Sequence, residues 1–192
     1  GNWTKKGSYL RGVIDEYGFD KIIGRGRLYR ITKPDVKLAK APKMFEESVE
    51  QLIEHLSHKN HWWRLEAQKL IVLKGDLSIV PALKELARNA NNPQTQIHAL
   101  WTLEGLGIVD ESLLLELIAG THSDVRITAM RISEQLFTKQ NQKIANLWLK
   151  LASDTDIEVV QQSVLSAYYV MSDNHQQVLN TALKTHPNKK GL

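Results

Sequence analysis

The chain has 192 residues, a formal net charge of +4 at pH 7 and no cysteine. Its hydrophobic content of 42% and charged content of 24% are typical of a globular protein, which excludes a collagen-like or wholly disordered chain. The lack of cysteine excludes disulfides, thiolate catalysis, cysteine-ligated zinc and attached c-type haem. No apolar run reaches the ~20 residues that a membrane-spanning helix needs.

Residues 1–33 have a composition typical of short strands separated by turns, since they contain six of the 11 glycines. The alternating residues 27–31 predict a strand, and residues 9–14 predict a weaker one. Two or three strands are not stable alone in water, so we expect this segment either to be the end of something larger or to form a strap packed on the helical part. Residues 34–43, which hold two prolines and three spaced lysines, are expected to form a linker.

From residue 44 onward, apolar residues recur at helical spacing, which predicts a helical domain over residues 44–186 and a tail over 187–192. Polar residues at four helix starts are expected to act as N-caps: Asn60, Asn92, Ser123 and Asp156. The pattern predicts these helices: residues 45–56, 61–74, 79–90, 93–105, 110–119, 123–137, 141–151, 156–171 and 174–185.

A repeat of just over 30 residues runs through this helical domain. A small residue recurs in every second helix at positions 67, 99, 129 and 163, which are 32, 30 and 34 residues apart. Paired helices with such a period predict an α-solenoid, because each hairpin must stack on its neighbours to bury both of its apolar faces. We therefore expect an all-α fold of about four hairpins plus one extra helix, cut within or just before a fifth repeat.

The second helices resemble HEAT repeats in the pair Val125-Arg126, three residues before the small residue. Arg64 fits this pattern, whereas Gln96 and Val160 depart from it. The predicted fold is therefore a HEAT-like solenoid preceded by a short β or irregular segment.

Three stretches together resemble a narrower family, the large bacterial proteins described as membrane-bound or sorbosone-type dehydrogenases. They are Gly-Arg-Leu-Tyr-Arg-Ile at 26–31, His-Trp-Trp-Arg at 61–64, and His-Ala-Leu-Trp-Thr-Leu-Glu-Gly at 98–105. The resemblance implies that residues 1–33 end a β-propeller, that a c-type cytochrome domain often follows the repeats, and that the protein is periplasmic or extracellular. Leu65 departs from the family, which has an acidic residue there.

The same resemblance places both the propeller active site and any haem domain outside this chain. No Cys-x-x-Cys-His motif is present, so we expect no cofactor and no metal in this chain, and we assign it no catalytic residue. The parent protein is then a dehydrogenase, while the chain itself is not expected to be an enzyme.

Seven residues form the candidate interaction surface: Trp62, Arg64, His98, Trp101, Glu104, Arg126 and Arg131. Trp62 is expected to be more exposed than Trp63, because neighbouring residues on a helix point about 100° apart. Trp62 then either anchors a partner or packs against the N-terminal segment.

His98, Trp101 and Glu104 are spaced three apart, which favours hydrogen bonds between repeats over acid–base chemistry by a histidine–glutamate pair. Arginines of the second helices, with Asp124 and Glu134, are expected to form a charged ladder between repeats, or else to bind an acidic ligand. The histidines at 55, 58 and 61 are expected to be solvated loop residues rather than metal ligands.

The sequence favours a non-catalytic scaffold that binds other domains of its parent or a protein partner. One alternative is a HEAT-like nucleic-acid enzyme of the alkylpurine DNA glycosylase type, suggested by the overall basic charge and the paired tryptophans; another is a lyase-like or chaperone protein. Residues 1–43 carry 11 basic and four acidic side chains, whereas residues 44–192 carry 14 and 17. The repeats are therefore acidic, which argues against nucleic acid as the partner.

Overall fold

The computed structural model describes residues 7–21, 42–136, 142–169 and 175–189, together with residues 24, 31, 35 and 40. The chain divides into two compact units, residues 1–41 and residues 42–192. The strand predicted over 27–31 lies outside the described residues except for Ile31. Throughout the described ranges, all regular secondary structure is helical.

Among the described residues of the first unit, Tyr9–Tyr17 form an α-helix, α1, so the weaker strand predicted over residues 9–14 is wrong. The Ser8 side chain caps the helix by accepting a hydrogen bond from the Arg11 N–H, and Gly18 ends it in the left-handed region at φ 64°. Apolar residues here recur every three to four positions, which suits a helix better than the strict alternation of a strand. The short window 9–14 concealed that period.

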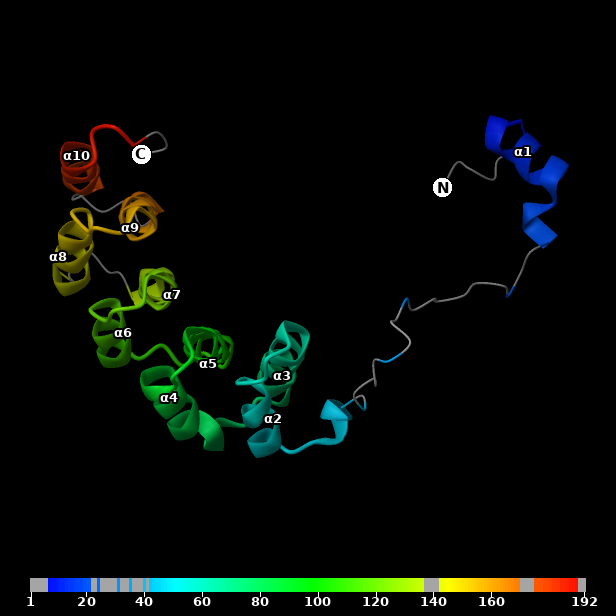
Figure 1. Ribbon diagram of the computed structural model, residues 1–192, viewed down its shortest axis with the longest axis horizontal. Helices are drawn as coiled ribbons and strands as arrows, with labels where there is room; N and C mark the ends of the chain where they lie inside the picture. The colour runs from blue at the N-terminus through cyan, green and yellow to red at the C-terminus, as the bar shows by residue number, and fades with distance from the viewer. Residues whose placement is uncertain are drawn as a thin grey trace. The chain divides into compact units, whose positions relative to one another are not determined.

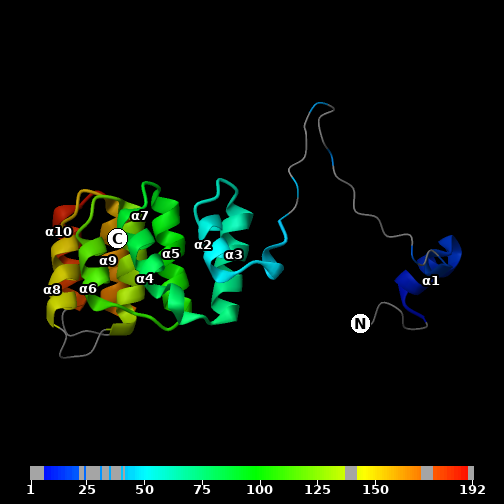
Figure 2. The same cartoon turned by 90° about the horizontal axis from the view of Figure 1, so that it is seen from below.

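The second unit is built from helical hairpins, as the sequence predicts (Figures 1 and 2). The hairpins are α2 (Val49–His55) with α3 (His61–Lys74), α4 (Val80–Asn89) with α5 (Pro93–Gly105), α6 (Glu111–Ile118) with α7 (Ser123–Ser133), and α8 (Gln142–Leu151) with α9 (Ile157–Tyr169). A further helix, α10 (His175–Thr185), follows. Short 3-10 turns occupy Met44–Glu46, Leu77–Ile79 and Glu134–Leu136. This arrangement confirms an all-α solenoid of four hairpins and one extra helix.

Three of the four predicted N-caps are confirmed. Asn60, Asn92 and Asp156 each accept a hydrogen bond from the backbone N–H two residues later, at 3.0, 2.9 and 2.9 Å. The cap predicted at Ser123 is wrong, because α7 already begins there and His122 occupies the N-cap position without a side-chain hydrogen bond. Asp124 instead lies in the first turn, where its negative charge interacts favourably with the positive end of the helix dipole.

The helices of the second unit form two rows. The second helices of the hairpins, α3, α5, α7 and α9, pack side by side in sequence order and follow the inner side of a curve (Figure 1). The first helices, α2, α4, α6 and α8, lie with α10 on the outer side. The recurring small residues are fully buried, with an exposed fraction of 0% at each: Ala67, Ala99, Ala129 and Ser163. The sequence repeat therefore marks the buried side of each second helix.

Candidate interaction surface

The inner row has a side that points away from the outer row. On a helix, the residues two before and two after a given position lie about 160° around the axis from it, so these residues oppose the buried small residue. We call these eight residues the inner surface: Leu65, Ile97, Ile127 and Gln161, followed by Lys69, Trp101, Arg131 and Leu165. All eight are half-buried or exposed, and five are apolar. The inner surface is thus a stripe of apolar side chains that crosses four helices.

The middle of the inner surface is occupied by Trp101 of α5 and Arg131 of α7. The Arg131 guanidinium carbon lies 5.9 Å from the centre of the Trp101 ring, within the range of a cation–π contact. Arg131 was expected to join a ladder of carboxylates, but its contact here is with an aromatic ring. Two predicted surface residues are therefore brought together, one from each of two neighbouring repeats.

His98 and Glu104, which share helix α5 with Trp101, bond to different neighbours. His98 is buried, and its Nδ1 lies 2.7 Å from the Gln68 Oε1 of α3. Glu104 Oε1 accepts a hydrogen bond of 2.7 Å from Gln135, which follows α7. The predicted hydrogen bonds between repeats are thus present on both sides of α5, and the two side chains have separate partners.

Burial, together with the smaller electrostatic effects of nearby Arg64 and His61, lowers the pKa of His98 to about 4. The imidazole is therefore neutral at pH 7. Because an amide oxygen only accepts, the Nδ1 of this neutral ring carries the proton that bonds Gln68. His98 thus acts as a fixed hydrogen-bond donor between α3 and α5.

In the first three hairpins, the residue three before the small residue closes its own hairpin. Arg64 donates to the carbonyls of His58 and Lys59, at 2.7 and 3.1 Å. Gln96 donates to the carbonyls of Ala87 and Arg88, both at 3.0 Å. Gln96 departs from the sequence pattern, but its amide performs the same task as the guanidinium of Arg64.

Arg126, the third residue of this series, joins two repeats as well as closing its own hairpin. It donates to the Ile118 carbonyl at 3.2 Å and binds both carboxylate oxygens of Asp154, in the loop before α9. Burial acts to raise the pKa of Asp154, but the hydrogen bonds from Arg126 and from the Asp156 N–H outweigh it, so this pKa is lowered. The charged ladder predicted through Asp124 is therefore wrong, because the acidic partner comes from the next loop.

Glu134, the other predicted acid of the ladder, bonds to neutral side chains within the described part of the chain. Its Oε1 accepts hydrogen bonds from Ser166 at 2.6 Å and from Gln162 at 3.4 Å, both on α9. It joins neighbouring repeats, as expected, but through neutral donors. Arg64 therefore closes its own hairpin, and Arg126 and His98 join neighbouring repeats. Trp101 and Arg131 lie on the inner surface.

The two adjacent tryptophans differ in exposure, as predicted. Trp62 is 54% exposed, whereas Trp63 is half-buried. Trp63 stacks on His58 with ring centres 4.1 Å apart and contacts the edge of His55. The prediction of solvated histidines is wrong for these two, and His55 Nε2 also lies 2.7 Å from Glu47 Oε2.

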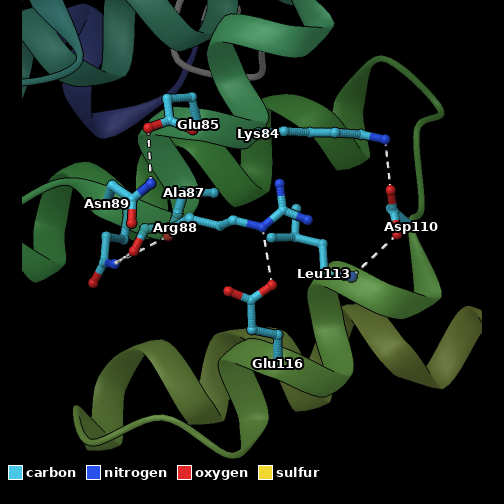
Figure 3. A network of polar contacts seen from close by, with 9 residues as sticks. Lys84, Glu85, Ala87, Arg88, Asn89, Asp110, Leu113 and Glu116 are labelled. Carbon is cyan, nitrogen blue, oxygen red and sulfur yellow. Dashed lines mark hydrogen bonds and ion pairs between the residues drawn. The ribbon is translucent and has the colours of Figure 1, made fainter.

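The outer row carries ion pairs that the sequence analysis missed. Figure 3 shows Lys84 of α4 beside Asp110, at 2.5 Å, and Arg88 of α4 beside Glu116 of α6, at 2.9 Å. The Lys84 hydrogen bond, together with that from the Leu113 N–H, lowers the pKa of the Asp110 carboxyl. Basic residues four apart in one first helix, with acids about one repeat later, were a signal in the sequence for these pairs.

In the described part of the chain, no helix is long and apolar enough to cross a membrane. The same residues hold no group of three or more histidine, aspartate or glutamate side chains suited to a metal ion. No family model, curated protein or solved structure matched the chain.

Proposed function

We propose that this chain is a non-catalytic protein-interaction module that binds a protein partner, or another domain of its parent protein, on the inner surface. The observation that carries the proposal is the alignment of Leu65, Ile97, Trp101, Ile127 and Leu165 across α3, α5, α7 and α9. Single exposed apolar residues are ordinary, but a stripe across four packed helices favours contact with another macromolecule. Two of these side chains are well exposed, Leu65 at 43% and Leu165 at 60%.

The partner that suits this surface is a protein segment with an apolar side. Trp101 and Arg131 belong to the residue types that dominate binding energy at protein interfaces. Both are held in place from behind, because the buried residues of α5 and α7 fix the two helices against their neighbours. A preformed surface of this kind loses little conformational entropy when it binds.

The charge of the inner surface favours a protein over a nucleic acid. Its eight residues include two basic side chains, Lys69 and Arg131, and Glu104 and Glu134 lie at the neighbouring positions. A nucleic-acid groove concentrates many lysines and arginines along one face.

As part of this proposal, the parent is a dehydrogenase of the sorbosone type, whose reading frame has a propeller before these repeats and a Cys-x-x-Cys-His motif after them.

Site-specific photo-crosslinking in cells that make the parent protein tests the proposal. We expect a crosslinking amino acid at Leu165 to form a discrete adduct that is lost when Leu65→Asp is added. A crosslinker at Glu85, which is exposed on the outer row, is the matched control and should form no such adduct. Equal crosslinking from both positions, or none from Leu165, rejects an inner binding surface. Duplex binding by the chain with a steep salt dependence would instead favour the glycosylase alternative.

A further inference from the structure

Helix α3 carries a second apolar feature on the side that faces away from α5. A groove of about 470 Å³ lies between this side and the segment Pro42–Glu46. The α3 residues that line it are Trp62, Glu66, Lys69, Leu70 and Leu73. Large apolar side chains are strongly exposed here, with Phe45 at 83% and Leu73 at 71%. The groove shares only Lys69 with the inner surface.

The corresponding side of every later second helix is an interface between repeats. In α5 it holds His98, which bonds Gln68 of α3. It also holds Gly105, where an added Cβ would lie 2.7 Å from a methyl carbon of Val72. In α9 the same side holds Ser166, which bonds Glu134. The groove on α3 therefore occupies the side that, in the later second helices, packs against the preceding repeat.

The residues on this side of α3 differ from those of α5, the next second helix. Leu70 and Leu73 stand where α5 has Thr102 and Gly105, so bulky apolar groups replace small ones. The exposed end of a solenoid is normally covered by polar residues. Apolar side chains at this end therefore indicate a face that is covered in the working protein.

The order of residues along this side is complementary to itself. Trp62, Glu66, Lys69 and Leu73 are spaced four, three and four apart, which is the spacing of a coiled-coil seam. In an antiparallel pair of α3 helices with a two-fold axis between residues 67 and 68, Trp62 opposes the partner's Leu73. Glu66 then opposes the partner's Lys69, and symmetry repeats both pairs.

We propose that two copies of this chain form a two-fold symmetric dimer through antiparallel packing of their α3 helices. A closed two-fold dimer is the commonest symmetry of soluble oligomers, and its interface must match itself, as this one does. Each apolar side chain meets an apolar one and each charge meets its opposite. The inner surface outside Lys69 stays open, so this inference is independent of the proposed function.

Charge reversal in the full-length chain tests the pairing, with the dissociation constant measured by sedimentation equilibrium over a concentration series. We expect the wild-type chain to dimerise, and Glu66→Lys or Lys69→Glu alone to raise the dissociation constant at least roughly tenfold, because like charges then meet at two places. The double variant E66K/K69E restores opposite charges and should return dimerisation to near the wild-type level. Glu85→Lys on α4 makes the same charge change away from the groove and should have no effect.

Trp62→Asp provides an independent test of the apolar pairs. It should abolish the dimer while leaving the helical circular dichroism unchanged, because Trp62 is more than half exposed in the single copy. A chain that remains a monomer at every concentration overturns the proposal and leaves the groove to another occupant. A dimer that tolerates Trp62→Asp, or a double charge variant that stays as weak as the single ones, also overturns it.

Discussion

The inner and outer rows of the solenoid are joined by different kinds of contact. Neighbouring inner helices are joined by side chains that are buried or half-buried, such as buried His98 with half-buried Gln68. Neighbouring outer helices are linked at partly exposed ion pairs, such as Arg88 with Glu116, whose side chains are 33% and 54% exposed. Buried contacts allow little change in geometry, whereas exposed ion pairs contribute little to stability. We therefore expect the inner row to set the stacking and to be far more sensitive to substitution.

The largest effect is expected at Arg126, which joins the third and fourth hairpins. Arg126→Leu leaves the Asp154 carboxylate, whose side chain is 15% exposed, without its main partner. We expect a loss of about 3 kcal/mol in the free energy of unfolding, because a largely buried charge is left uncompensated. Urea titration followed by far-ultraviolet circular dichroism measures this loss. In the double variant R126L/D154L the loss should be smaller, and an equal loss contradicts the explanation.

A pH-dependent effect is expected at His98. Because the pKa of His98 is about 4 in the folded chain and near 6.5 when unfolded, the unfolded state binds the proton first as the pH falls. The stability from the neutral ring is therefore complete above pH ~6.5 and is lost towards pH ~4, by as much as about 3 kcal/mol. Urea titrations at several pH values measure this. His98→Gln should remove this part of the pH dependence, and an unchanged profile counts against the assignment.

A moderate effect is expected where α3 and α5 approach most closely. Gly105→Ala places a methyl group 2.7 Å from Val72 Cγ2, so the two helices must shift apart. We expect a net loss of about 1 kcal/mol, since crowding outweighs the better helix propensity of alanine. The change in melting temperature measures it. Val72→Ala in the same chain makes room for the methyl group, and the double variant should be more stable than G105A alone.

The smallest effect is expected in the outer row. Arg88→Ala should lower the melting temperature only slightly, because its partner Glu116 is 54% exposed and the pair is screened by salt. The difference from wild type should shrink further as sodium chloride is raised in thermal melts. An effect as large as that of Arg126→Leu would remove the distinction between the two rows.

The sequence predicted the solenoid well, because a strong 3.6-residue period and a small residue in every second helix reflect the same packing requirement. The helical period cannot be read over a stretch as short as residues 9–14, so the start of α1 was interpreted as a weak strand. The N-cap of α7 was predicted one residue too late, at Ser123 instead of His122, because helix ends are hard to place to within a residue from sequence.

The candidate surface was predicted only in part. The exposure of Trp62, and the hydrogen bonds that His98 and Glu104 form with other repeats, follow from the places of these residues on the helices. The partner of Arg126 could not be predicted from the sequence, since Asp154 lies 28 residues away in a loop whose path depends on tertiary packing. Gln96 is the opposite case. It departs from the arginine expected at this position, yet its amide makes the same kind of hydrogen bond to the first helix.

Val160 occupies the position at which Arg64, Gln96 and Arg126 close the earlier hairpins, and a valine side chain has no donor. In the fourth hairpin, the Asp154 carbonyl is instead 2.9 Å from Nε2 of His186, which follows α10. The loop of this hairpin is therefore held in part by a residue that follows α10, in addition to Arg126 of the preceding repeat. Opening of α10 should leave the α8–α9 loop less protected against amide hydrogen exchange, so that the array loosens in order from this end.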